Sequence, residues 1–296
     1  MKTVLTVNLD GETFWSGMFE GTEKRPKTLS MGDYGIRRGL DRVLKTLKDY
    51  DMKATFFVPG LIAERHPETI EKVMKGGHEV AFKGYTHKQM HLLSREQIEE
   101  EFAKGTELFT RMTGQAPLGF RVPEGEFTQD VFEIAAKYGY QYSSSLYDRD
   151  QPYYHEVKAA EEQDAKTETE EQDAKTETEE QDAVSQTEEQ DAENGKKVSR
   201  ILEIPMNWNT HDLPYFAFNY GPAFPIGQSR VSSYERVTEN YIEEFDAYKY
   251  YDLTFVPQFT PQSIGSPGKI QIMEKILAHI RESREEAHLC LCRDLL

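Results

Sequence analysis

Two carboxylates stand directly after the first apolar run of the chain. Residues 4–9 read Val-Leu-Thr-Val-Asn-Leu and are followed by Asp10, Gly11 and Glu12. Such a run is typical of a parallel strand buried on both faces, and the carboxyl ends of such strands carry the functional groups of α/β enzymes. Asp10 and Glu12 are two residues apart, so in extended chain they lie on one face together with Asn8. Either this is a catalytic strand end, or Asp10-Gly11 is an ordinary turn.

Polar side chains also follow later apolar runs. One short run ends at Lys83, and His87 lies four residues further along. Residues 119–123 form a short strand and turn that contain Arg121, and Glu124 comes next. Glu124 either faces the same site as Asp10 or is a solvated turn residue. These side chains could bind a cation or move a proton if the fold brings them together.

Two further histidines have plainer interpretations. His78 follows two glycines at the start of a strand and is expected to be structural. His91 lies four residues after His87, so it could complete a pair of metal ligands, but its polar neighbours favour a surface position,.

Alternating strands and helices must position these residues. A polar loop is expected over residues 14–30, and a capping box at Ser94 starts one of the helices,. The alternation predicts an α/β protein with a parallel sheet, and its regularity suits a barrel. Strands are expected near residues 4–9, 53–58, 78–82, 119–123, 140–146, 201–204, 253–256 and 289–292, with helices near 36–47, 67–75, 94–112, 131–138, 237–248 and 272–280.

An acidic segment interrupts this pattern. The chain has 296 residues and a net charge of −17, yet residues 161–193 alone hold 15 Asp or Glu and 2 Lys. A nine-residue repeat places Gln at 163, 172, 181 and 190. So charged a segment cannot bury enough apolar surface to offset its ordering entropy. We expect residues 159–197 to be a disordered insertion in one domain formed by residues 1–158 and 198–296.

The composition of the chain bears on its cellular compartment and on its possible partners. Cys290 and Cys292 are the only cysteines and are read as two buried thiols in a reducing compartment,. We expect no signal peptide and no membrane-spanning run, and therefore a cytoplasmic protein. Outside the acidic insertion the charge is ordinary, so a nucleic-acid partner is not expected. A homo-oligomer is compatible with the sequence.

In its motifs the chain resembles the polysaccharide deacetylase family, whose NodB-homology fold is a distorted (β/α)7-type barrel. The resemblance covers the chain apart from the acidic insertion and is greatest to the peptidoglycan-deacetylase-like and cyclic-amide-hydrolase-like branch. The matching pieces, in order, are Asn8–Asp10, Gly77–Val80, Gly84–His87, Gly119–Glu124, Leu202–Pro205 and the loop Pro261–Pro267.

The resemblance implies a zinc-like divalent metal held by one Asp and two His. Asp10 matches the metal-binding Asp, His87 matches the second histidine, and Arg121 matches the arginine that orients the base. The chain departs from the family at three positions. Asn8 replaces the base carboxylate, Lys83 replaces the first histidine, and Thr260 replaces the histidine that protonates the leaving amine.

The favoured function is hydrolysis of a carbon–nitrogen bond other than a peptide bond, in an N-acetyl sugar or a small or cyclic amide. Here Lys83 could supply the positive charge of a metal, with Glu12 or Glu124 as base. Activity would be reduced or metal-independent. Two alternatives stay open: an inactive relative that binds a glycan or amide ligand, and an interaction protein tethered by the acidic repeat. The side chains expected to contact substrate are Tyr85, Pro123, Trp208 and Asp212.

Overall fold

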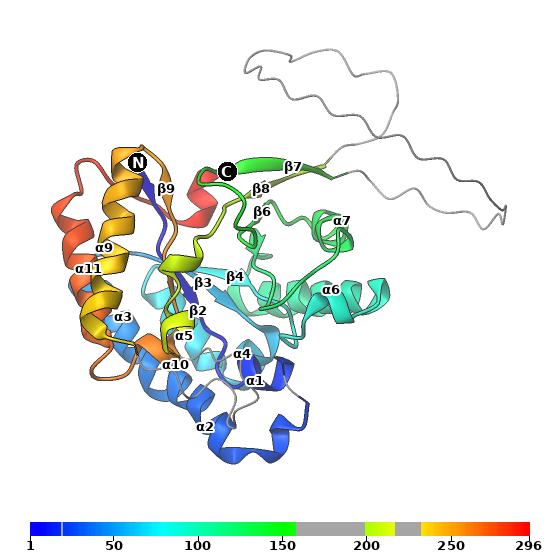
Figure 1. The fold of residues 1–296 in the computed structure, drawn as a ribbon. Helices are drawn as coiled ribbons and strands as arrows, with labels where there is room; N and C mark the ends of the chain where they lie inside the picture. Colours follow the sequence, from blue (N-terminus) through cyan, green and yellow to red (C-terminus); the bar gives the residue numbers. More distant parts are fainter. Residues whose placement is uncertain (19, 158–198, 217–231) are drawn as a thin grey trace, which may run out of the picture.

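A curled sheet of eight strands forms the centre of the protein (Figure 1). The computed structural model describes residues 1–18, 20–157, 199–216 and 232–296. Neighbouring strands are parallel, except that the edge strand β7 runs antiparallel to β8. In order across the sheet, the strands are β10 (Gln258–Phe259), β2 (Thr6–Asn8), β3 (Thr55–Val58), β4 (Glu79–Phe82), β5 (Gly119–Phe120), β6 (Tyr142–Ser143), β8 (Ser199–Glu203) and β7 (Tyr153–Val157).

A second, smaller parallel sheet has the order β11 (His288–Leu289), β1 (Lys2–Thr3) and β9 (Thr254–Phe255). β1 and β9 directly precede β2 and β10 in the chain, so this sheet joins the larger one at the edge formed by β10 and β2. The final strand is shorter than expected, because the chain turns into a 3-10 helix at Cys292. Cys292 is buried and Cys290 is partly exposed.

Helices pack around the curled sheet. α3, α9 and α11 gather on one side, whereas α6 and α7 pack together on the other (Figure 1). The helices are α1 (Thr13–Met18), α2 (Pro26–Tyr34), α3 (Leu40–Asp49), α4 (Gly60–Arg65), α5 (Pro67–Lys75), α6 (Arg95–Thr113), α7 (Asp130–Lys137), α8 (Asp212–Phe216), α9 (Tyr234–Tyr250), α10 (Pro261–Ile264) and α11 (Ile270–Glu282).

Local sequence accounts for many of these boundaries. The Ser94 hydroxyl oxygen accepts a hydrogen bond from the Gln97 backbone N–H, and Gln97 Oε1 accepts one from the Ser94 backbone N–H. This is the predicted capping box that starts α6,. Pro67 occupies the first turn of α5, where its missing N–H is not needed,. The residues of β3 are all buried, as expected for a strand covered on both faces,.

The α/β fold with a curled parallel sheet is confirmed. β7 and β10 form the two edges of the larger sheet, so the described strands make a half-barrel. The polar loop expected over residues 14–30 is wrong, because α1 and most of α2 lie there. Both helices are short. Because the segment has few apolar residues, its sequence shows no helical periodicity from which they could be predicted.

The acidic insertion lies outside the described residues. The strands on either side of it are β7 and β8, and Val157 pairs directly with Ser199 in the antiparallel ladder. The two described residues that flank the segment therefore lie side by side in the sheet. Among the described helices, none is long and apolar enough to cross a membrane.

Candidate active site

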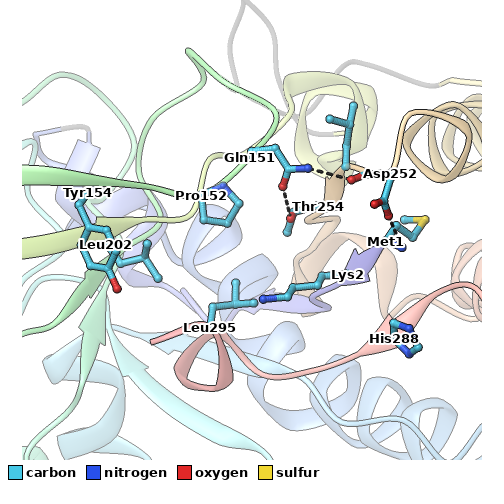
Figure 2. A pocket seen from close by; sticks show the side chains of 11 residues that line it. Met1, Lys2, Gln151, Pro152, Tyr154, Leu202, Asp252, Thr254, His288 and Leu295 are labelled. Atoms are coloured by element: carbon cyan, nitrogen blue, oxygen red, sulfur yellow. Dashed lines mark hydrogen bonds and ion pairs between the residues drawn. The ribbon is translucent and has the colours of Figure 1, made fainter. Parts of the chain in front are cut away.

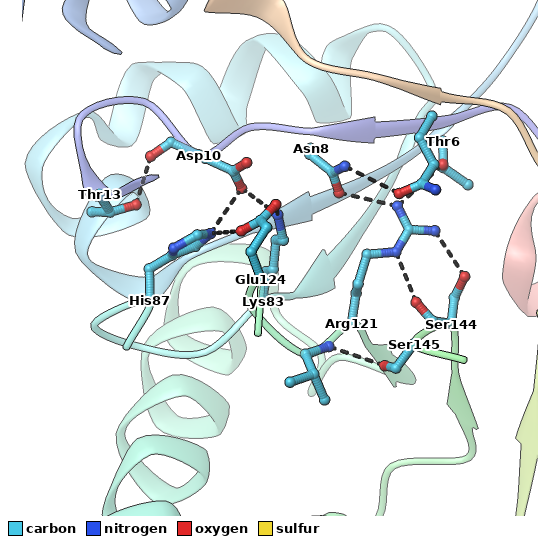
Figure 3. A network of polar contacts seen from close by, with 12 residues as sticks. Thr6, Asn8, Asp10, Thr13, Lys83, His87, Arg121, Glu124, Ser144 and Ser145 are labelled. Atoms are coloured by element: carbon cyan, nitrogen blue, oxygen red, sulfur yellow. Dashed lines mark hydrogen bonds and ion pairs between the residues drawn. The ribbon is translucent and has the colours of Figure 1, made fainter. Parts of the chain in front are cut away.

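Four polar side chains meet where neighbouring parallel strands end. Asp10 follows β2 by two residues, Lys83 follows β4 directly, and Glu124 lies four residues beyond β5. Because β2, β3, β4 and β5 are neighbours in the sheet, their carboxyl ends share one rim,. Figure 3 shows these three side chains converging with that of His87.

The Lys83 ammonium joins two carboxylates. Its Nζ atom lies 2.8 Å from Asp10 Oδ1 and 2.8 Å from Glu124 Oε1. Lys83 is 1% exposed and Asp10 is fully buried. An ammonium has three donors, and the third has no partner among the residues that the structure describes. Lys83 also lines a cavity of about 460 Å³, where the oxygen of a bound molecule would complete its hydrogen bonds.

His87 lies beside the same carboxylates. Its Nε2 atom is 3.2 Å from Asp10 Oδ1 and 3.1 Å from Glu124 Oε2, and the residue is fully buried. The backbone of His87 has a φ of 63°, a conformation that costs roughly 1–3 kcal/mol outside glycine and that clusters at functional sites. α1 packs directly on this turn, since a Cβ at Gly17 would lie 2.1 Å from the His87 carbonyl oxygen.

Glu101 of α6 holds the loop between Lys83 and His87. Its carboxylate accepts hydrogen bonds from the backbone N–H of Tyr85 at 2.6 Å and of Thr86 at 2.8 Å, and from the Thr86 hydroxyl at 2.6 Å. The loop has no regular secondary structure to satisfy these donors. Glu101 is therefore a positioning residue for both cationic side chains of the cluster.

Opposite charges balance within the cluster. Burial opposes ionisation of Glu124, but the charges of Lys83 and His87 outweigh it and hold the pKa of Glu124 well below its usual value. Burial likewise disfavours the imidazolium form of His87, yet the charges of Glu124 and Asp10 outweigh it and raise the pKa of His87. Two carboxylates thus face two basic side chains in a buried setting, where such contacts are strong.

The cluster does not fit the divalent metal that the family resemblance implies. Asp10, His87 and Glu124 do place potential ligand atoms within 4.8 Å of one another, and Asp10 Oδ2 is buried without a hydrogen-bond partner. However, Lys83 already donates to both carboxylates. A divalent ion would add two positive charges beside that ammonium and would compete with it for the same two carboxylates.

Arg121 holds Asn8 at the adjoining strand ends (Figure 3). The buried guanidinium donates to Asn8 Oδ1 at 3.0 Å and to Thr6 Oγ1 at 3.2 Å, and its other nitrogens donate to the carbonyl and hydroxyl of Ser144. It also lies 4.0 Å from the centre of the Phe57 ring. The arginine expected to orient a base is thus in place, but it orients an amide.

The third departure is also near the rim. Thr260 is fully buried at the start of α10, next to β10. Its hydroxyl lies near the Asp212 carboxyl and lowers the pKa of that group against the effect of burial. A hydroxyl with its ordinary high pKa is a poor proton donor compared with an imidazolium, so the expected general acid is absent at this position.

Two of the four predicted substrate contacts line the cavity. Pro123 and Trp208 both border it. Trp208 packs edge-on against Tyr147, with ring centres 5.9 Å apart, and the two aromatic side chains are about half exposed. Such a pair can bind an apolar face of a ligand while its polar groups stay accessible.

Three other predicted site residues lie apart from the cavity. Glu12 accepts a hydrogen bond from Arg65 Nη1 at 3.1 Å. The Tyr85 hydroxyl donates to Glu64 at 3.0 Å. Asp212 is fully buried, and burial raises its pKa to about 7, partly offset by nearby Ser263 and Thr260. None of the three borders the cavity. Strand-end position alone did not reveal which way these side chains face.

The two remaining histidines behave as their plainer interpretations predict. His78 is buried, and its Nδ1 accepts a hydrogen bond from the Ala54 backbone at 3.2 Å. Burial lowers the pKa of His78 to about 4. His91 is exposed, and its ring contacts the Glu126 carbonyl at 2.9 Å. His91 therefore does not complete a metal site with His87.

The sequence reasoning missed His211 and Gln258, which both line the cavity. A parallel β-bridge pairs these two residues, and Gln258 Oε1 accepts a long hydrogen bond of 3.4 Å from Asn8. The only available signal was that His211 follows Trp208 in a polar run after a strand. Its partner Gln258 is 47 positions further along the chain, so spacing could not join them.

A second cavity of about 630 Å³ lies at the opposite ends of the strands (Figure 2). Lys2, Thr254 and His288, the first residues of β1, β9 and β11, all border it. The amino terminus lies there, 2.7 Å from Asp252. In barrels of this kind the amino-terminal face serves stability, whereas chemistry takes place at the other face.

Comparisons with known proteins agree with this geometry. Residues 21–143 match the polysaccharide deacetylase family. The peptidoglycan deacetylase of Helicobacter pylori is 29% identical over 286 residues, which cover 93% of this chain and 88% of that protein.

Two solved structures share the fold. A candidate polysaccharide deacetylase from Mycobacterium smegmatis superposes with a TM-score of 0.77 at 22% identity, over 99% of this chain and 88% of that chain. The PuuE allantoinase superposes with a TM-score of 0.72 at 18% identity, with the same two coverages. At these identities the likeness concerns the fold alone.

Proposed function

We propose that this chain, which matches the polysaccharide deacetylase family over residues 21–143, hydrolyses a carbon–nitrogen bond other than a peptide bond. The observation that carries the proposal is the Lys83 ammonium between Asp10 and Glu124, at the rim where the fold places chemistry,. Its substrate would be an N-acetyl sugar or a small or cyclic amide. The relative from Helicobacter pylori is a peptidoglycan deacetylase by name, which favours the N-acetyl sugar.

Lys83 takes the place of a metal in this proposal. Attack on an amide carbonyl puts negative charge on its oxygen, and a fixed positive charge in a dry site stabilises that oxygen. The two carboxylates hold the Lys83 ammonium in one position. Because the cluster does not fit a divalent ion, the reaction is proposed to proceed without one.

The cavity supports a small substrate. Its volume of about 460 Å³ is within the usual range for small-molecule sites,. Apolar side chains such as Phe14, Met206 and Leu213 share its wall with polar groups that could orient an amide. Trp208 and Tyr147 border the same cavity and offer aromatic surface for a sugar ring or a flat amide.

One observation favours a second candidate, an inactive relative that binds a glycan or amide ligand. Asn8 has no proton affinity near neutral pH, and Thr260 is a weak acid, so both family proton carriers are lost,. Arg121 nevertheless keeps its hydrogen bond to Asn8, and the cavity remains open to a ligand.

An assay on the full chain separates the candidates. Triacetylchitotriose and hydantoin serve as probes, with acetate release and ring opening as readouts, in the presence of EDTA or of added zinc. The proposal predicts slow turnover that EDTA does not remove and that Lys83→Met abolishes. Binding of a probe by calorimetry without any turnover would favour the inactive relative. A large stimulation by zinc would contradict the role given to Lys83.

A further inference from the structure

Hydrolysis of an amide requires a group that accepts and donates protons. Neither of the two positions that carry such groups in the family holds one in this chain. Water must lose a proton as it attacks, and the leaving nitrogen must gain one. Asn8 and Thr260 cannot do this at neutral pH. Glu12 is bound to Arg65 away from the cavity.

Glu124 borders the cavity but is a poor base. Lys83 and His87 both lie about 3 Å from its oxygen atoms. Each of the two oxygen atoms is thus already paired with a basic side chain, so this carboxylate is poorly placed to take a proton from water,.

His211 lines the same cavity as Asn8, Lys83 and Arg121. It lies between Thr210, the end of a 3-10 helix, and α8, and its backbone bridges to Gln258 at the edge of β10. The residue is 5% exposed. Both of its ring nitrogens are buried and have no hydrogen-bond partner among the described residues.

Such a histidine is unusual in a folded protein. A buried imidazole normally donates one ring N–H and accepts at the other nitrogen, because unpaired buried polar atoms cost about 1–3 kcal/mol each. Burial is also the main cause that lowers the pKa of His211 to about 3. The positive charges of Lys83 and Arg121 act in the same direction, and the negative charges of Glu124 and Asp10 oppose it. The ring is therefore neutral at pH 7, with one nitrogen free to accept a proton.

We propose that His211 is the proton-transfer residue of this site, with one ring nitrogen that accepts the proton of the attacking water and returns it to the leaving nitrogen. This inference rests on the proposed function and names the catalytic group that it lacks. It goes beyond the family resemblance, which places both proton carriers at Asn8 and Thr260.

The step balances without any further reactant. Water loses a proton to the His211 ring as its oxygen bonds to the carbonyl carbon, and the carbonyl electron pair moves to the oxygen beside Lys83. The carbon–nitrogen bond then breaks, and the leaving nitrogen takes the proton from the imidazolium. The products are a carboxylic acid and an amine. The imidazolium and the oxyanion form together, so each offsets the cost of burying the other.

The test uses the full chain and its His211→Ala and His211→Gln variants on triacetylchitotriose and hydantoin, with and without added imidazole. His288→Ala is the matched control, because His288 is exposed at the opposite end of the strands. Loss of a general acid–base group is worth about 10²–10⁴ in rate, so we expect at least a 100-fold loss in both variants. Imidazole should restore activity to His211→Ala, whose cavity has room for it, and not to His211→Gln.

The outcomes distinguish a failure of the inference about His211 from a failure of the proposed function. If the unmodified chain is active and His211→Ala retains its rate, the inference is wrong and the proposed function stands. If His211→Ala melts like the unmodified chain, is inactive and is not rescued by imidazole, the lost imidazole is not the proton carrier and the inference is again wrong. If the unmodified chain turns over neither probe, the proposed function fails and the inference fails with it.

Discussion

Arg121 donates a hydrogen bond to Asn8 Oδ1 at 3.0 Å in the buried centre of the site. The family resemblance assigns this arginine to a carboxylate base, so the chain keeps the orienting group while the base has become an amide. The same region holds Lys83 against Asp10 at 2.8 Å. Two of the three departures from the family, Asn8 and Lys83, thus form buried hydrogen bonds within the site.

Asn8→Asp should leave the stability nearly unchanged. The new carboxylate can accept the same hydrogen bond from Arg121, and the nearby positive charge offsets its burial,. Asn8→Leu is the matched comparison, since it removes the acceptor and leaves a buried guanidinium donor unpaired, at a cost of about 1–3 kcal/mol. Urea unfolding measures both changes. A larger loss for Asn8→Asp than for Asn8→Leu would contradict the assignment of Arg121 as the orienting group.

Lys83→His should create zinc binding. The substitution removes the ammonium and returns a second imidazole beside Asp10 and His87, which gives the three ligands of a catalytic zinc site,. Elemental analysis after dialysis should find about one zinc in the variant and little in the unmodified chain. Lys137→His, on the exposed surface of α7, is the control. Adding Asp10→Ala to the variant should abolish binding, and zinc retained there would place the site elsewhere.

Restoring all three positions should bring back metal-dependent deacetylation. We expect Asn8→Asp, Lys83→His and Thr260→His together to release acetate from N-acetylglucosamine oligomers with added zinc or cobalt. The base and the acid are each worth about 10²–10⁴ in rate, so single replacements should give little. Efficient metal-stimulated deacetylation by the unmodified chain would overturn the interpretation of these three residues.

Asp212→Asn should stabilise the protein increasingly as pH rises. Burial raises the pKa of Asp212 from 3.8 to about 7, so folding favours its protonated form. The contribution of this group is complete below pH 3.8 and is lost as pH rises toward 7, by up to about 1.4 kcal/mol per pH unit. Urea unfolding at pH 4, 6 and 8 should show the variant gaining on the unmodified chain. A constant difference across that range would mean that Asp212 does not titrate there.

Replacing residues 159–197 with a short glycine-containing turn should preserve the fold. Val157 and Ser199 pair directly, so the two strands can be joined by a hairpin,. The composition of the insertion predicts no packing against the core. Thermal melts of the shortened and full chains should agree within a few degrees, whereas a fall of ten degrees or more would show that the segment packs.

The sequence by itself determined the fold class and the strand ends at which the site lies. Apolar runs followed by Asp10, Lys83 and Arg121 place these residues at strand ends, because a parallel sheet aligns the carboxyl ends of its strands. The three departures at Asn8, Lys83 and Thr260 were also visible, since they depend on residue identity alone. The capping box at the start of α6 is equally local.

Only the tertiary structure decided which side chains face one another. Glu12 turns to Arg65 and Glu124 turns to Lys83, although both are carboxylates close after a strand. His211 enters the cavity through its pairing with Gln258, a residue far away in the chain. Such contacts depend on how the sheet curls and how loops cross its rim, and no periodicity in the sequence encodes that arrangement.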